Sequence, residues 1–370
     1  MFFFTIVVVF LCCLYFVMVT AFAIGITRIK GHIEPSNDFL PISVVVALRN
    51  EQDNIDNLLK SLTNQNYPTD KVEIILVNDH STDRTWAIAN DWAERADNVV
   101  LLNLSIGVEG KKPAIAYGVS IAKYDMIMLT DADCVHSKGW LQSISTQFYH
   151  KAFDLLIGPV MLAPSIGFFE KMQALEHASL TASSLGACAL RVPFMASSAN
   201  LSFNKSRLGF NLQLLNPNFA SGDDVFLLHS AKRNPDVRIE CAFSHDSLVY
   251  TKPTNSFANF LLQRARWASK ATGYSDFMAI GVSLVVLLFN FLLVFLAVLS
   301  FWNFTFLEML AIGFLVKSVA DLFLFYPYLK RCQKVSLLNV FLPLQLVYPF
   351  YTVTTFALAM FTKVQWKGRG

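Results

Sequence analysis

Long apolar stretches bracket a central region of ordinary composition. The first stretch runs from Phe2 to Ile26 and is rich in Phe, Val, Leu and Ile. At about 1.5 Å of rise per residue, it is long enough to cross a hydrocarbon core of about 30 Å. It lacks the basic start and the short apolar core of a signal peptide, so it predicts a retained transmembrane helix over residues 1–27.

Three further apolar stretches follow the central region, at about 278–300, 304–326 and 338–362. Four crossings are therefore expected, the last three within residues 277–362. Arg28 and Lys30 follow the first stretch and Lys330 and Arg331 the third, which indicates that these ends face the cytoplasm. The chain is predicted to be a multi-pass integral membrane protein whose central domain is cytoplasmic.

The side of the C-terminus stays open. Lys363, Lys367 and Arg369 follow the last apolar stretch, on the side opposite to the other basic residues. Pro343 and Pro349 allow that stretch a re-entrant path instead of a full crossing.

The third apolar stretch contains the ionisable residues Glu308, Lys317 and Asp321. Each is costly in lipid unless it faces protein or water. Lys317 and Asp321 are four positions apart, so they can pair on one helix face. Two interpretations follow: a polar path for an acceptor or product, or an internal pair that locks helices together.

Short β-branched runs alternate with helical patterns in residues 40–250. Strands are predicted at 42–48, 72–77, 99–102 and 125–130, and helices at about 55–62, 84–96 and 111–122. This alternation predicts an α/β fold with a mostly parallel sheet and helices on both faces, whose ligands bind at the carboxyl ends of the strands.

Acidic residues follow two of these strands. Asp79 comes after the second strand, and Asp131-Ala132-Asp133 after the fourth. Carboxylates gathered at one sheet edge are costly unless a cation joins them. Asp131 and Asp133 point the same way in an extended segment, which suits ligation of Mg²⁺ or Mn²⁺ that also carries a diphosphate. A solvated turn is the alternative.

Two further polar segments are ambiguous. Asp223 and Asp224 stand at the start of a predicted helix, a position that favours Asp for its backbone amides alone. Residues 251–276 predict an amphipathic helix at the membrane interface, where a Trp is at home and basic side chains snorkel to water. The functional interpretation places Arg266 on a diphosphate and the Trp267 ring under a sugar.

The overall composition agrees with this division. Hydrophobic residues make up 54% of the 370 positions, more than a soluble fold of this size needs. The 30 basic residues nearly balance the 27 acidic ones, which argues against a nucleic-acid partner. Six cysteines without metal-ligand spacing or a pairing pattern indicate a reduced compartment.

Taken in order, these motifs give the chain a family resemblance. It resembles the membrane-bound family 2 glycosyltransferases, the inverting group that includes cellulose, chitin, hyaluronan and poly-N-acetylglucosamine synthases and ceramide glucosyltransferase. The motifs that carry the resemblance are Ala47–Glu51, Asn78–Asp83, Gly110-Lys111 with Ala114-Ile115, Asp131–Asp133, Gly222–Asp224 and Gln263–Trp267. The resemblance implies a nucleotide-sugar-binding, Rossmann-like GT-A fold for residues 40–250.

The resemblance also implies roles for nine residues. Asp79, Lys111, Asp131 and Arg266 would bind the nucleotide-sugar, Asp133 the metal, Gln263 and Trp267 the acceptor, and Asp224 with Asp223 would be catalytic. As general base, Asp224 would take the proton of an acceptor hydroxyl while that oxygen attacks the anomeric carbon and inverts it. The implied partners are Mg²⁺ or Mn²⁺, a nucleotide-sugar donor (a UDP-sugar is expected), and a lipid or glycan acceptor.

Some positions depart from the family pattern. Ser198 stands where Gly is expected, Asn78 where relatives have an acid, and Asp223 where many have Glu. Glu176, in the segment before Ser198, is interpreted as a helix-surface acid rather than an acceptor contact.

Three functions remain in competition. Transfer of one sugar to a lipid or lipid-linked acceptor is the first. A processive polysaccharide synthase is the second; because four helices are few for a secretion channel, it would need an oligomer or a secretion partner. A non-catalytic membrane scaffold is the third, and it would not need Asp133, Asp224 and Arg266 together.

Overall fold

The computed structural model describes residues 2–361 except 32, 35, 37, 164–166 and 220, and the chain divides into two compact units. Of the described residues, the helical unit comprises those within 2–28, 167–192 and 253–361, and the sheet unit those within 29–163 and 193–252. Lys363, Lys367 and Arg369, on which the expectation for the C-terminal side depends, lie outside the described residues.

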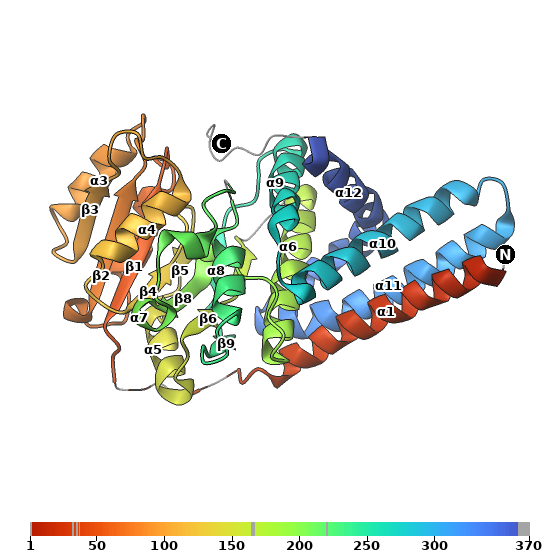
Figure 1. Cartoon of the computed structure of the whole chain (residues 1–370), viewed down its shortest axis with the longest axis horizontal. Helices are drawn as coiled ribbons and strands as arrows, with labels where there is room; N and C mark the ends of the chain where they lie inside the picture. Colours follow the sequence, from red (N-terminus) through yellow and green to blue (C-terminus); the bar gives the residue numbers. More distant parts are fainter. Residues whose placement is uncertain are drawn as a thin grey trace. The chain divides into compact units, whose positions relative to one another are not determined.

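A seven-stranded sheet forms the centre of the sheet unit, with strand order β3-β2-β1-β4-β8-β6-β9 (Figure 1). Its strands are β1 (Ile42–Leu48), β2 (Val72–Asn78), β3 (Val99–Asn103), β4 (Met126–Leu129), β6 (Leu155–Ile157), β8 (Leu201–Asn204) and β9 (Ile239–Cys241). Neighbouring strands from β3 to β4 run parallel, and β8 is antiparallel to both its neighbours. The predicted mostly parallel sheet is therefore confirmed.

Helices cover both faces of this sheet. The helices of the sheet unit are α2 (Ile55–Thr63), α3 (Thr85–Ala93), α4 (Lys111–Ile121), α5 (Trp140–Lys151), α7 (Lys205–Leu208) and α8 (Asp223–Lys232), with short 3₁₀ turns at η1 (Thr69–Lys71), η2 (Ser198–Asn200) and η3 (Leu212–Leu215). Val44 of β1 belongs to a buried core with Leu58 of α2. Its neighbour Val45 faces α4, where a Cβ on Gly118 would lie 2.6 Å from the Val45 side chain. Strands buried on both sides read as near-continuous apolar runs, which explains the sequence of β1, where Ser43 is the one polar residue.

A small second sheet includes the strand that follows the Asp131–Asp133 turn. It has the order β5-β10-β7, with β5 (Val135–His136), β7 (Val160–Leu162) and β10 (Val249–Thr251). Because β5 begins two residues after Asp133, its pairing with β10 fixes the chain directly behind the Asp131–Asp133 turn.

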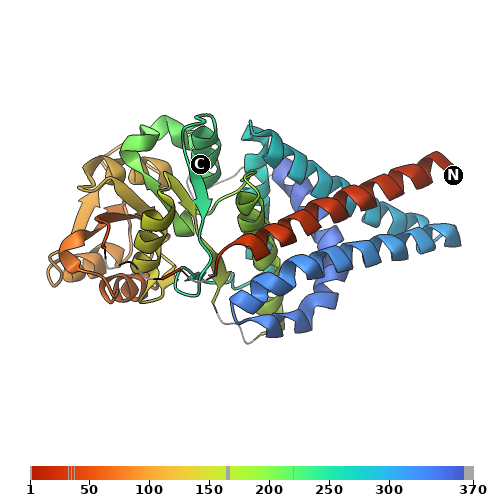
Figure 2. The ribbon, with the colours of Figure 1, turned by 90° about the horizontal axis from the view of Figure 1, so that it is seen from below.

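The helical unit contains the expected apolar helices. Its helices are α1 (Phe2–Arg28), α6 (Phe168–Ala189), α9 (Phe257–Ser269), α10 (Phe277–Leu299), α11 (Phe304–Arg331) and α12 (Phe341–Phe361), with 3₁₀ turns η4 (Lys270–Gly273) and η5 (Val335–Val340). Among the described residues, α1, α10, α11 and η5–α12 are long and apolar enough to cross a membrane. Helices α1 and α11 lie side by side (Figures 1 and 2). Helix α12 continues through Pro349.

Lys317 and Asp321 pair inside the helical unit as their spacing predicts. Lys317 Nζ lies 2.6 Å from Asp321 Oδ2 and donates to Gln345 Oε1 of α12 at 2.8 Å. Tyr15 of α1 donates its hydroxyl to the other Asp321 oxygen at 2.6 Å. Since the pair joins α1, α11 and α12, these contacts favour the interpretation that it locks helices together. Glu308, by contrast, is exposed.

Candidate active site

The carboxyl ends of β1, β2 and β4 meet at one edge of the sheet because the three strands are parallel neighbours. Arg49, just after β1, ties the first two loops together. Its Nη1 donates to the backbone oxygens of Asp79 at 2.7 Å and His80 at 3.0 Å. Polar side chains from separate loops are thereby held at the edge where ligands of such sheets bind.

Asp79 is fully buried at the end of β2. Its Oδ2 accepts the backbone N–H of Gly110 at 3.1 Å. Gly110 has φ 106°, a left-handed value that favours glycine, and it directly precedes α4. Asp79 therefore fixes the turn that presents Lys111, the first residue of α4.

Lys111 lies at the centre of a group formed with Asp131, Ser198, Asp223 and Asp224, called here the Lys111 cluster. Its Nζ is 2.8 Å from Asp131 Oδ1 and 3.2 Å from Asp223 Oδ2, and it donates to Ser198 Oγ at 2.7 Å. Burial alone lowers the pKa of Lys111, but Asp131, Asp223 and Asp224 outweigh burial and raise it above its ordinary value. The ammonium thus stays charged and balances part of the acidic charge.

The first turn of α8 supplies the two acids from the second half of the sheet unit. Gly222, at φ 90°, is the N-cap residue directly before the helix. Asp223 is buried, whereas Asp224 is half-exposed. The backbone N–H of Ser198 donates to Asp224 Oδ2 at 3.3 Å, and the Ser198 hydroxyl lies 3.5 Å from Asp131 Oδ1. Ser198, singled out in the sequence only as a departure from Gly, therefore joins three members of the cluster.

Asp133 carries a negative charge that its surroundings oppose. Its pKa is raised to about 6 by burial first, then by the nearby carboxylates Asp131 and Glu51, against a stabilising hydrogen bond with Thr251. A divalent cation at this turn would relieve the repulsion. The described residues contain no group of three or more His, Cys, Asp or Glu side chains able to hold a metal alone. Mg²⁺ is commonly bound by one or two carboxylates plus water and substrate phosphates, so the donors present fit such an ion.

His136, which the sequence did not single out, supports the turn from behind. Its Nε2 lies 2.8 Å from Thr130 Oγ1, and its Nδ1 lies 3.1 Å from Ser61 Oγ. Because Ser61 gives its own proton to Leu58 O, His136 donates from Nδ1 and accepts at Nε2. Burial lowers the pKa of His136 to about 3, so the ring stays neutral.

The remaining predicted site residues lie on α9 of the helical unit. Gln263 accepts a hydrogen bond from Arg264 Nη1 at 2.5 Å, and the Trp267 ring lies 4.2 Å from the Arg264 guanidinium carbon. Arg266 is half-buried on the same helix. The structure thus places Gln263, Arg266 and Trp267 in one unit and the six acidic and lysine candidates in the other.

Two expectations for this region are wrong. Glu176, interpreted as a helix-surface acid, is 2% exposed on α6. Arg264, expected to snorkel to water with the other basic residues of α9, is 5% exposed. The reason is that each is the other's partner: Arg264 Nη2 lies 2.5 Å from Glu176 Oε2. Ion pairing between residues 88 positions apart leaves no periodic signal in the sequence.

The strand order and the flanking helices define a Rossmann-like α/β fold of the GT-A type. The mannosyltransferase PcManGT from Pyrobaculum calidifontis, solved in complex with GDP-Man and Mn²⁺, superposes with a TM-score of 0.56. The superposition covers 95% of this chain and 97% of that chain at 16% identity, so it shows a shared fold. Residues 43–199 match the family model described as Glycosyl transferase family 2. The chain therefore contains a family 2 glycosyltransferase domain, as its motifs predicted.

Sequence relatives agree with this family. The probable glycosyltransferase YdaM of Bacillus subtilis is 37% identical over 94 residues, which is 25% of this chain and 22% of that protein. Glycosyltransferase AglE of Haloferax volcanii is 25% identical over 233 residues, 61% of this chain and 71% of that protein. The chain thus spans under a quarter of the first relative and most of the second.

Proposed function

We propose that the chain is an inverting glycosyltransferase that moves a sugar from a nucleotide-diphosphate donor to a lipid or lipid-linked acceptor at the cytoplasmic membrane face. The observation that carries the proposal is the Lys111 cluster. It gathers carboxylates from separate loops at the carboxyl edge of a family 2 domain, in a chain whose described residues include four helices able to span a membrane. An edge of this kind suits a nucleotide diphosphate and a cation.

Asp224 is the better candidate for the general base of the two neighbouring acids. Asp223 is 4% exposed and paired with Lys111, so its charge is already engaged. Asp224 is half-exposed, and the Ser198 N–H holds one of its oxygens. A carboxylate that is fixed but reachable can take the proton of an acceptor hydroxyl while that oxygen forms the new bond to the anomeric carbon.

Asp133, with Asp131 beside it, would hold Mg²⁺ or Mn²⁺ together with the donor diphosphate. The raised pKa of Asp133 supports this role, since a buried carboxylate beside other acids is stabilised by a cation. Neutralising charge on the departing diphosphate is the chemistry that such an ion supplies when bound. Lys111 would add a permanent positive charge on the same side.

The other predicted residues complete the proposal. Asp79 would read the base of the donor, expected to be a UDP-sugar, and Arg266 would bind its diphosphate. Gln263 and Trp267 would contact the acceptor. Residues 1–27 and 277–362 would anchor the enzyme in the membrane, with 251–276 at the interface. Arg28 in the last turn of α1 and Arg331 in the last turn of α11 support a cytoplasmic sheet unit.

A processive synthase is the second candidate, because relatives of both kinds exist. One match is named beta-monoglucosyldiacylglycerol synthase and another poly-beta-1,6-N-acetyl-D-glucosamine synthase. Single transfer is favoured here because the described residues include four helices able to span a membrane, which are few for a secretion channel. A ladder of long polymer from the purified chain would favour the second candidate, and one glycolipid band the first.

Release of nucleoside diphosphate by the detergent-solubilised full chain tests the proposal. UDP-glucose, UDP-N-acetylglucosamine and GDP-mannose are supplied in turn with Mn²⁺ and a total lipid extract. Asp224→Asn should lower release at least about 100-fold, as expected for loss of a general base. Asp91→Asn, an exposed acid-to-amide change on α3, is the matched control and should keep wild-type rates. Equal rates for wild type and Asp224→Asn would contradict the assignment.

A further inference from the structure

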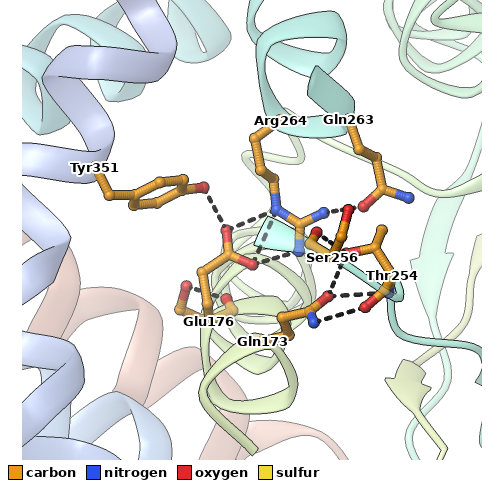
Figure 3. Close-up of polar contacts among 8 residues, drawn as sticks. Gln173, Glu176, Thr254, Ser256, Gln263, Arg264 and Tyr351 are labelled. Atoms are coloured by element: carbon orange, nitrogen blue, oxygen red, sulfur yellow. Dashed lines mark hydrogen bonds and ion pairs between the residues drawn. The ribbon is translucent and has the colours of Figure 1, made fainter. Parts of the chain in front are cut away.

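Arg264 of α9 is buried among partners from two other helices (Figure 3). Its Nε lies 3.0 Å from both carboxylate oxygens of Glu176, and its Nη2 lies 2.5 Å from Oε2. Tyr351 of α12 donates its hydroxyl to Glu176 Oε1 at 2.9 Å. The guanidinium is therefore held in one place and one plane by α6, which α12 in turn supports.

The other side of the same guanidinium contacts two predicted acceptor residues. Its Nη1 donates to Gln263 Oε1 at 2.5 Å, which fixes how the Gln263 amide is turned. Its carbon lies 4.2 Å from the centre of the Trp267 ring and 4.7 Å from that of Phe260. Planar contacts with an amide and an aromatic face are what a guanidinium offers and an ammonium does not.

The start of α9 is fixed independently of Arg264. Gln173 of α6 donates to Thr254 O at 3.0 Å and accepts from the Thr254 hydroxyl at 2.9 Å. Ser256 then caps α9 by accepting the Asn259 N–H at 3.2 Å. These hydrogen bonds hold the backbone at the start of α9 without Arg264. The contacts of Arg264 therefore act mainly on the side chains of its neighbours.

We propose that Arg264, held by Glu176, is a positioning residue that orients Gln263 and Trp267 to receive the acceptor. The inference rests on the proposed function, since that function gives Gln263 and Trp267 their acceptor role. It adds a residue that the sequence assigned only to the membrane interface. The ion pair sets the plane of the guanidinium, and the guanidinium sets the amide of Gln263 and the ring of Trp267.

The test replaces the planar guanidinium group of Arg264 by an ammonium group. Arg264→Lys keeps a positive charge for Glu176 but cannot bond Gln263 and stack on Trp267 at once. It should stay folded with a lower thermal unfolding midpoint and keep the donor KM, while kcat/KM for the lipid extract falls roughly tenfold to a hundredfold, the scale expected from misplaced contacts. Arg95→Lys, at an exposed arginine, is the matched control. Wild-type kcat/KM in Arg264→Lys would overturn the proposal.

A second readout does not depend on activity. The chain has six Trp. With 5-fluorotryptophan in all of them, the ¹⁹F resonance lost in Trp267→Phe identifies position 267. Arg264→Lys and Glu176→Gln should shift that resonance, and Glu308→Gln, an exposed acid-to-amide change in the same unit, should not. An unmoved Trp267 resonance in both variants would overturn the inference. Absence of nucleotide release from every donor by the wild type would instead contradict the proposed function.

Discussion

At the level of single residues, the site depends on how one ammonium is shared. Lys111 contacts Asp131 from the β4 turn and Asp223 from α8, and the Ser198 hydroxyl fills its third position. Any ligand that approaches Asp131 therefore also meets a fixed positive charge. This arrangement suits a donor diphosphate, because the ammonium of Lys111 can bind a phosphate oxygen in place of one carboxylate. Its positive charge is then balanced in either case.

Ser198→Ala tests the link between Lys111 and the rest of the cluster. The change removes the hydroxyl that accepts from Lys111 but keeps the backbone N–H that holds Asp224. Loss of one hydrogen bond to a charged group costs about 1.5–3 kcal/mol, so kcat/KM should fall at least about tenfold. Steady-state release of nucleoside diphosphate measures it. Ser120→Ala, at an exposed serine of α4, should leave the rate unchanged.

His136 makes the stability of the chain depend on pH. Its pKa is about 3 in the folded chain and about 6.5 when unfolded, so between these values the unfolded chain binds a proton that the folded chain does not. This contribution is present above pH 6.5 and is lost as pH falls, by about 2 kcal/mol at pH 5. Thermal unfolding at pH 7.5 and pH 5 should show a smaller difference in His136→Gln than in wild type. The exposed His150→Gln should behave as wild type.

At the level of elements, the sequence pattern predicted the features that depend on residues close together in the chain. The strand expected at 42–48 is β1, and the Ile55 to Leu62 spacing gives the buried face of α2. The Lys317–Asp321 pair followed from a separation of four residues within one helix. Arg264 with Glu176, and Ser198 with Lys111, could not be predicted, because each pair forms only when distant segments pack. Burial of such groups depends on tertiary partners, which periodicity does not record.

Close packing of α1 on α6 rests on two glycines. A Cβ on Gly25 would lie 2.1 Å from the backbone oxygen of Gly186, and one on Gly186 would lie 2.2 Å from that of Phe22. Backbone atoms cannot move aside, so Gly25→Ala should separate the helices and destabilise the chain by about 1–3 kcal/mol. Gly281→Ala in α10 has open space around it and should be neutral or stabilising. Equal unfolding midpoints for the two variants would contradict this packing.

For the molecule as a whole, buried charge ties together helices that are far apart in sequence. Glu176–Arg264 joins α6 to α9, and Tyr351 adds α12. Lys317–Asp321 joins α11 to α1 and α12 through Tyr15 and Gln345. For helices apolar enough to span a membrane, such as α1, α11 and α12, apolar contact alone gives little preference for one another in lipid, so we expect the Lys317–Asp321 contacts to specify which of them pair.

The Lys317–Asp321 pair allows this idea to be tested on stability. Asp321→Asn leaves the buried Lys317 without its carboxylate, and breaking a buried pair on one side costs about 3–5 kcal/mol. The double change Lys317→Met with Asp321→Leu removes both charges and should recover most of that loss, since apolar replacement of a whole pair is often neutral. Unfolding by SDS titration in mixed micelles measures the difference, with the exposed Glu308→Gln as control. A double variant as unstable as Asp321→Asn would mean that apolar packing cannot replace the helix contacts of the pair. An Asp321→Asn variant as stable as wild type would mean that the pair does not hold the helices together.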